Sequence, residues 1–103
     1  MTKQKSVYTT GERQTERQIE RELKALANRR RLAIIRYPAS VKEANVSDIA
    51  GEIKLSFKST SRHLAVLISA DILEKEQRGL EVHHRLASRR SPIVRQMLEL
   101  LRN

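Results

Sequence analysis

Apolar residues recur three or four positions apart over most of the chain, which is the spacing that one face of a helix requires. Five stretches have this pattern, and each predicts an amphipathic helix: residues 12–27, 28–37, 46–53, 56–70 and 91–101. Two further stretches, ILEKE and LEVHHRL, predict strands around residues 77–79. In the second strand the residues that alternate to one side are Leu80, Val82, His84 and Leu86.

Helix-capping residues and prolines mark the ends of these elements. Asn28 and Ser56 stand where a helix N-cap is needed, and Ser91 followed by Pro92 is typical of a helix start. Pro38 is expected to end the second helix and to be followed by a loop. The order of four helices, a hairpin and a last helix is that of a winged helix-turn-helix. We therefore expect a fold that is mostly α with a small β-hairpin, made of five helices plus a two-stranded wing.

The first helix repeats every four residues, as ERQT, ERQI and EREL. In a helix this repeat stacks glutamates beside arginines at spacings that let the charges meet, so a solvated, salt-bridged face is favoured over a binding surface. The third stripe is expected to be buried, and it comprises Thr15, Ile19, Leu23, Leu26 and Ala27. Residues 1–10 are polar and unpatterned, which predicts a flexible arm before a single domain over residues 11–103.

Charge and composition narrow the class of partner. The 103 residues include 21 Lys and Arg against 12 Asp and Glu, for a net charge of +9, which favours a polyanionic partner such as nucleic acid. No membrane-spanning or secretory segment is evident, so a cytoplasmic protein is expected. With one Phe, two Tyr and no Trp, a stacking platform for single-stranded nucleic acid is disfavoured.

The stretch SFKSTSRHLAVL, residues 56–67, combines a capped helix start with two different faces. Thr60, Leu64 and Leu67 form its inward stripe. The outward residues near the N-terminus are those that meet base edges and phosphates when a helix enters the major groove: Lys58, Ser59, Ser61 and Arg62. His63, at the edge of this face, either touches phosphate or is only solvated. Phe57 either packs into the core, which we favour, or contacts a thymine methyl group.

Three segments in this order resemble the ArsR-type family of bacterial and archaeal repressors over residues 23–86. They are LKALANRRRLAII, VSDIAGEIKLSFKSTSRHLAVL and ILEKEQRGLEVHHRL, and SRHLAVL is the most specific part. The chain departs from the family at Lys58, where serine or proline is more frequent, and at Thr60, where a buried valine is usual. The resemblance implies a regulator of transcription that binds double-stranded DNA, with Arg78 at the wing tip as a minor-groove or phosphate contact.

Many members of that family release DNA on binding a metal, but the ligands are missing here. The chain has no cysteine, and the family's cysteine pair would fall at Asn45 and Ser47. His83 and His84 are adjacent in a predicted strand, so their side chains point to opposite faces. We therefore expect no metal site and no cofactor.

The last helix has an apolar arc of roughly 160°, wider than the roughly 100° that one core contact requires. Relatives that resemble this chain dimerise through their first and last helices. A homodimer is therefore expected, and a buried core helix in a monomer is the alternative. The residues expected at the dimer interface are Ile19, Leu23, Ile93, Val94, Met97, Leu98 and Leu101.

Together these features favour a homodimeric, metal-independent repressor that binds specific sequences of double-stranded DNA. Two alternatives stay open: a chromatin-like protein that coats DNA without specificity, and a winged-helix module that docks on an acidic protein of the transcription machinery. No nucleophile with a base at workable spacing and no phosphate-binding glycine loop occurs, so an enzyme is not expected. The sequence does not identify a small-molecule effector.

Overall fold

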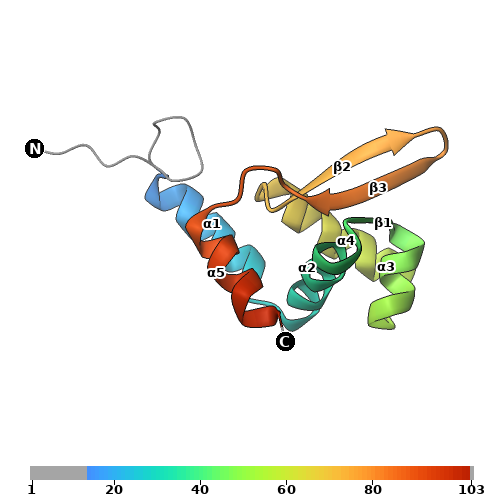
Figure 1. Ribbon diagram of the computed structural model, residues 1–103, viewed down its shortest axis with the longest axis horizontal. Helices are drawn as coiled ribbons and strands as arrows, with labels where there is room; N and C mark the ends of the chain where they lie inside the picture. The colour runs from blue at the N-terminus through green and yellow to red at the C-terminus, as the bar shows by residue number, and fades with distance from the viewer. Residues whose placement is uncertain (1–13, 103) are drawn as a thin grey trace, which may run out of the picture.

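The computed structural model describes residues 14–102, which form five helices and three strands (Figure 1). In chain order the elements are α1 (Glu16–Leu26), α2 (Arg29–Val41), β1 (Glu43–Asn45), α3 (Val46–Ile53), α4 (Phe57–Ser69), β2 (Leu73–Arg78), β3 (Glu81–Leu86) and α5 (Pro92–Leu101). The predicted winged helix-turn-helix is confirmed. The predicted N-terminal arm lies outside the described residues.

The sheet is antiparallel, with the order β1-β3-β2. Strands β2 and β3 form the predicted hairpin, in register from Leu73 opposite Leu86 to Arg78 opposite Glu81. Strand β1 was expected to be loop, because three residues are too few to show alternation; it pairs with the other edge of β3. Leu80 was expected in the inward stripe of the strand, but it lies in the turn and is fully exposed.

The core joins the helices to one face of the sheet. Its largest buried side chains come from α2, α3, α4 and the segment entering β2, and they include Ile34, Ile35, Ile49, Leu64, Leu67, Ile72 and Leu73. The hairpin extends away from the helices, whereas α1 and α5 lie side by side at the end opposite α3 (Figure 1). The core therefore supports α4 from behind and leaves its other face to solvent.

Helix α1 begins later than the charge repeat predicted. Thr15 is its N-cap, in a capping box with Gln18, so Thr15 does not belong to the buried stripe. Leu23 and Ala27 were expected in that stripe too, but both are exposed. Glu20 pairs with Lys24 one turn later at 3.5 Å, whereas the repeat predicted pairs of glutamates with arginines. The helix also buries Glu22, which the repeat placed among solvated charges.

Buried Glu22 connects α1 to the start of α5. Ser91 Oγ donates to Glu22 Oε1 at 2.6 Å and accepts from the backbone N–H of Val94, as the predicted N-cap of α5. Gln14 Nε2 donates to the same carboxylate oxygen at 3.2 Å. One hydroxyl thus both caps α5 and satisfies a carboxylate that α1 buries.

Pro38 does not end α2, contrary to the expectation from sequence. The helix continues to Val41, and Lys42 N donates to Pro38 O at 2.8 Å before the chain turns at Lys42 with φ of 79°. A proline removes one backbone donor but keeps its carbonyl, so the following turn still closes. The buried pyrrolidine ring adds apolar packing at this position.

Candidate nucleic-acid interface

Helices α3 and α4 form the helix-turn-helix. Asn45 caps α3 by accepting from the backbone N–H of Asp48, and Lys54 turns the chain in the left-handed conformation with φ of 58°. Ser56 then caps α4 by accepting from the backbone N–H of Ser59 at 3.1 Å, as predicted. These local hydrogen bonds fix the direction in which the first turns of α4 leave the core.

Helix α4 has the two faces that the sequence predicts. Thr60, Leu64 and Leu67 are buried against the other helices. Lys58 and Arg62 lie one turn apart and exposed, and within residues 14–102 neither pairs with a carboxylate. Of the other predicted base-contacting residues, Ser59 and Ser61 are each half-buried along the sides of this face. The exposed cations stand next to the N-terminus of α4, whose backbone dipole also favours negative charge.

The exposure of Phe57 contradicts the interpretation that we favoured from the sequence. It was expected to pack in the core, but its residue is 59% exposed. Phe57 is the first residue of α4 and precedes the inward stripe, which starts at Thr60, so its ring leaves the first turn toward solvent. The alternative role, contact with a thymine methyl group, is compatible with this exposure and stays a prediction.

His63 is bound to another helix. Arg31 Nη1 lies 3.1 Å from His63 Nδ1, and because a guanidinium only donates, Nδ1 must accept and the ring proton must be on Nε2. Burial, followed by the charges of Arg31 and Arg30, lowers the pKa of His63, so the ring is neutral at neutral pH. Arg31 also donates to the carbonyls of Ala25 at 2.6 Å and Lys24 at 3.4 Å, at the end of α1. A phosphate contact by His63 is therefore limited to its Nε2–H.

In the wing, Arg78 is paired with carboxylates of the sheet, and its contact with DNA stays a prediction. Its guanidinium donates to both carboxylate oxygens of Glu43 on β1, at 2.5 and 3.0 Å, and to Glu76 at 3.0 Å. Arg85 is bound in the same way by Glu74 and Glu76. Hydrogen bonds from Arg78 lower the pKa of Glu43 and of Glu76, so both carboxylates stay ionised at neutral pH and hold the guanidinium on the sheet.

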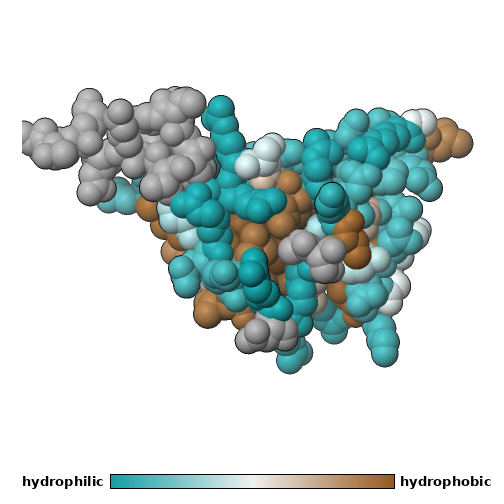
Figure 2. All heavy atoms as spheres, viewed as in Figure 1, coloured by the Kyte–Doolittle hydropathy of each residue, from teal (hydrophilic) through white to brown (hydrophobic). Residues whose placement is uncertain are grey.

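The residues predicted at a dimer interface lie on α1 and α5. Leu23 is 49% exposed, and apolar side chains reach the surface of this face, over and beside α5 (Figure 2). Val94 is different, because it is only 1% exposed and packs in the core, so it has no surface left for a second chain. The remaining predicted residues are half-buried in one chain: Ile19, Ile93, Met97, Leu98 and Leu101.

No three metal-ligating side chains cluster within the described part of the chain. Asn45 is a helix cap, as described above. His83 and His84 point to opposite faces of β3 as expected, with His84 buried in the core and His83 beside Glu81 and Glu43. Among residues 14–102, no helix is long and apolar enough to cross a membrane.

The architecture defines the class as a winged helix-turn-helix, and comparisons with known proteins give the family. A family model described as "Bacterial regulatory protein, arsR family" matches residues 28–75. A search of curated proteins finds no match.

Several solved structures are similar over most of the chain. Reduced HlyU from Vibrio cholerae is 30% identical with a TM-score of 0.70, over 82% of this chain and 85% of that one. The homodimeric DNA-binding domain Mb0332 from Mycobacterium bovis, described as a possible ArsR-family transcriptional regulator, is 30% identical with a TM-score of 0.71, over 84% and 76%. The transcriptional repressor PagR of Bacillus anthracis is 27% identical with a TM-score of 0.70, over 82% and 93%.

The chain belongs to the ArsR family of bacterial regulatory proteins. Members of this family are DNA-binding regulators of transcription and not enzymes, which agrees with the expectation from sequence.

Proposed function

We propose that this protein is a homodimeric, metal-independent repressor that binds specific sequences of double-stranded DNA and occludes polymerase. The observation that carries the proposal is the first two turns of α4, where Lys58 and Arg62 are exposed beside Ser59 and Ser61 and pair with no carboxylate of residues 14–102. Arginine can bind guanine through two hydrogen bonds, and serine can donate or accept at a base edge. Lysine adds attraction to phosphate.

Dimerisation is supported by the open apolar faces of α1 and α5. A two-fold dimer would place two copies of α4 in successive major grooves, about one turn of DNA apart. Mb0332 is described as homodimeric and PagR as a repressor, and both share this fold.

The exposed ring of Phe57 favours a second candidate, a module that docks on an acidic protein. Aromatic residues are enriched at the centres of protein interfaces. Phe57 stands alone among charged and hydroxyl side chains, and the apolar surface that such a docking face needs is not continued along α4.

The proposal is tested by selecting bound sequences from random duplex DNA at near-physiological salt, where pure phosphate attraction is suppressed. We expect an inverted repeat with half-sites about one helical turn apart. Strong binding without an enriched sequence would instead favour a chromatin-like role, and failure to retain DNA would favour the docking module.

Arg62→Ala and Lys58→Ala separate base reading from phosphate attraction. Arg62→Ala should relax base preference and cost about 1–3 kcal/mol on the selected sequence, measured by titration against selected and random duplexes. Lys58→Ala should weaken binding to both duplexes alike and lower the salt slope by about one unit. Equal losses on the two duplexes for Arg62→Ala would contradict its assignment as a base reader.

A further inference from the structure

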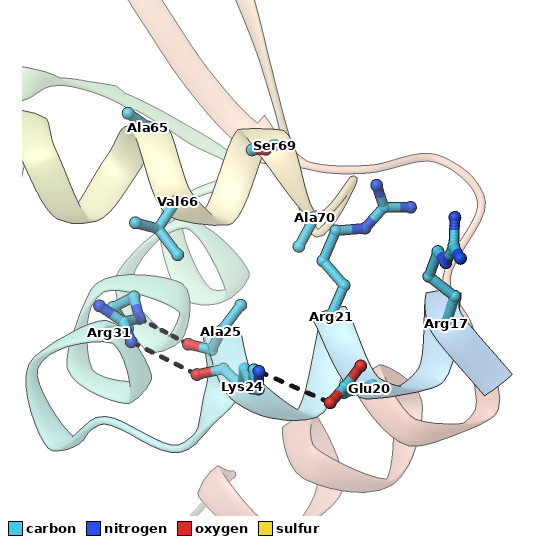
Figure 3. A pocket seen from close by; sticks show the side chains of 10 residues that line it. All are labelled: Arg17, Glu20, Arg21, Lys24, Ala25, Arg31, Ala65, Val66, Ser69 and Ala70. Carbon is cyan, nitrogen blue, oxygen red and sulfur yellow. Dashed lines mark hydrogen bonds and ion pairs between the residues drawn. The ribbon is translucent and has the colours of Figure 1, made fainter.

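A groove of about 730 Å³ runs between α1 and the second half of α4 (Figure 3). Its lining brings together four cations and a single carboxylate, with small or apolar side chains behind them. From α1 and α2 come Arg17, Glu20, Arg21, Lys24, Ala25 and Arg31, and from α4 and its C-cap come Ala65, Val66, Ser69 and Ala70. We call this the α1–α4 groove.

The cations of α1 form a row along one side of the groove. Arg17, Arg21 and Lys24 are spaced four and three residues apart, so they share one stripe of the helix. In Figure 3, Arg17 and Arg21 rise from α1 beside the end of α4, and within residues 14–102 neither pairs with a carboxylate. Lys24 pairs with the exposed carboxylate of Glu20 at 3.5 Å, an ion pair that solvent weakens.

This row stays accessible in the proposed dimer. At about 100° per residue, the stripe of Arg17 and Arg21 is on the opposite side of α1 from Ile19 and Leu23. A second chain that covers the apolar side of α1 would therefore leave the cations free.

The α4 wall of the groove continues the outward face of that helix, on which Lys58 and Arg62 lie. Lys58, Arg62, Ala65 and Ser69 follow one another at spacings of four, three and four residues, which places them on one stripe. The first half of this stripe carries cations, and the second half carries small side chains beside the row on α1. A strand of DNA that follows the outer face of α4 would pass from one set of cations to the other.

The wing has fewer cations available for DNA. Arg78 and Arg85 are both bound by carboxylates of the sheet, which also has Glu81 close to the turn. Both arginines of the hairpin are thus held by carboxylates, whereas within residues 14–102 Arg17 and Arg21 on α1 are not.

We propose that the α1–α4 groove holds the phosphate backbone of the duplex that α4 reads, so that α1 supplies flanking contacts in addition to those of α4. The row from Arg17 to Lys24 extends for about 10 Å at 1.5 Å per residue. That length matches a repeating charge such as a DNA strand, with one phosphate per about 3.4 Å of axis, better than it matches one small anion. The inference rests on the proposed function, because the phosphates in the groove would belong to the same duplex that α4 reads.

The test compares the slope of log affinity against log salt for the wild type, Arg17→Ala/Arg21→Ala and a control, Arg102→Ala. Arg102 is at the C-cap of α5 and pairs with Glu99, so its loss removes a cation outside the groove. We expect the double variant to lower the slope by about two units on selected and random duplexes alike, with base preference unchanged. Arg102→Ala should keep the wild-type slope.

Glu20→Gln should have the opposite effect on binding, because it removes the one carboxylate that the described residues contribute to the groove and keeps every cation. Tighter binding to both duplexes is expected from this variant.

The possible failures are distinguishable. Normal specific binding by the wild type with an unchanged slope in Arg17→Ala/Arg21→Ala would overturn the inference and leave the proposed function standing; the groove would then be open to a smaller anion. If Arg17→Ala/Arg21→Ala lowered the slope but the wild type had no sequence preference, the result would support the groove and overturn specific recognition. No binding of duplex DNA by the wild type would overturn both.

Discussion

At the scale of single residues, Thr60 stands out because it is buried with an unused hydroxyl. The residue is fully buried in the inward stripe of α4, and among the described residues its Oγ1 has no hydrogen-bond partner. A buried hydroxyl without a partner costs free energy that an apolar group of the same shape does not. The resemblance to the family pointed to this position, since a buried valine is usual there.

Thr60→Val should therefore raise the free energy of unfolding by about 1 kcal/mol, because valine keeps the shape and removes the unpaired hydroxyl. Urea denaturation of the two proteins measures the difference. Thr60→Ala is the matched control, because it removes the hydroxyl but also leaves a cavity, and it should not stabilise the protein. A loss of stability in Thr60→Val would mean that the hydroxyl is bound in solution.

Other single residues could not be placed from sequence, because their partners are far away in the chain. The ion pair of Arg78 with Glu43, 35 residues earlier, crosses β3 and has no local signal in the sequence. His63 was expected at the edge of the reading face, and Arg31, 32 residues earlier, binds its ring. Local patterns identify the residue type and the element, whereas such contacts depend on tertiary packing.

At the scale of elements, the sequence predicted those whose ends carry their own signals. Helix α3 has the predicted bounds, and α5 begins at Pro92 after Ser91 as expected. The misplaced ends lacked such signals or had misleading ones. The charge repeat extended the predicted start of α1, and Pro38 is tolerated inside α2. Strand β1 depends on pairing with β3, which no local pattern can show.

The central strand β3 makes stability sensitive to pH through His84. Burial is the main cause that lowers the pKa of His84 below its ordinary value, partly opposed by a backbone hydrogen bond with Ala44. The pKa of His63 is lowered too, again mainly by burial. Since the unfolded chain binds these protons more readily, the protein loses stability as the pH falls below 6.5 and keeps it above.

We therefore expect the free energy of unfolding of the wild type to decrease between about pH 7.5 and about pH 5.5. The decrease should be smaller in His84→Gln, which cannot take up a proton. Urea denaturation across this range gives both values. Carboxylates such as Glu43, whose pKa is lowered, contribute only at more acidic pH. A pH dependence in His84→Gln equal to that of the wild type would assign the effect to other groups.

At the scale of the whole molecule, charge and apolar surface are separated. The sheet balances its arginines with glutamates, whereas α1 and α4 have exposed cations. The net charge of +9 alone could not show this separation. The open apolar side of α1 and α5 is a third region, and it is the one expected to bind a second chain.

Leu23→Glu should convert the dimer to a monomer, because it buries a charge in the proposed interface. The single chain should tolerate the charge, because Leu23 is 49% exposed there. Light scattering at about micromolar concentration gives the mass. Leu80→Glu is the matched control: the same substitution at the fully exposed wing tip should leave the mass of two chains unchanged. A wild-type mass equal to one chain would refute the dimer directly.

The position of Arg31 would couple the arrangement of the two subunits to the position of α4. Its guanidinium holds the end of α1 through two carbonyls and the middle of α4 through His63. In a dimer assembled on α1, a small rotation of one subunit against the other would be transmitted through this side chain to α4 and would alter the separation of the two recognition helices. Arg31 would thereby link subunit geometry to the half-site spacing that the protein accepts.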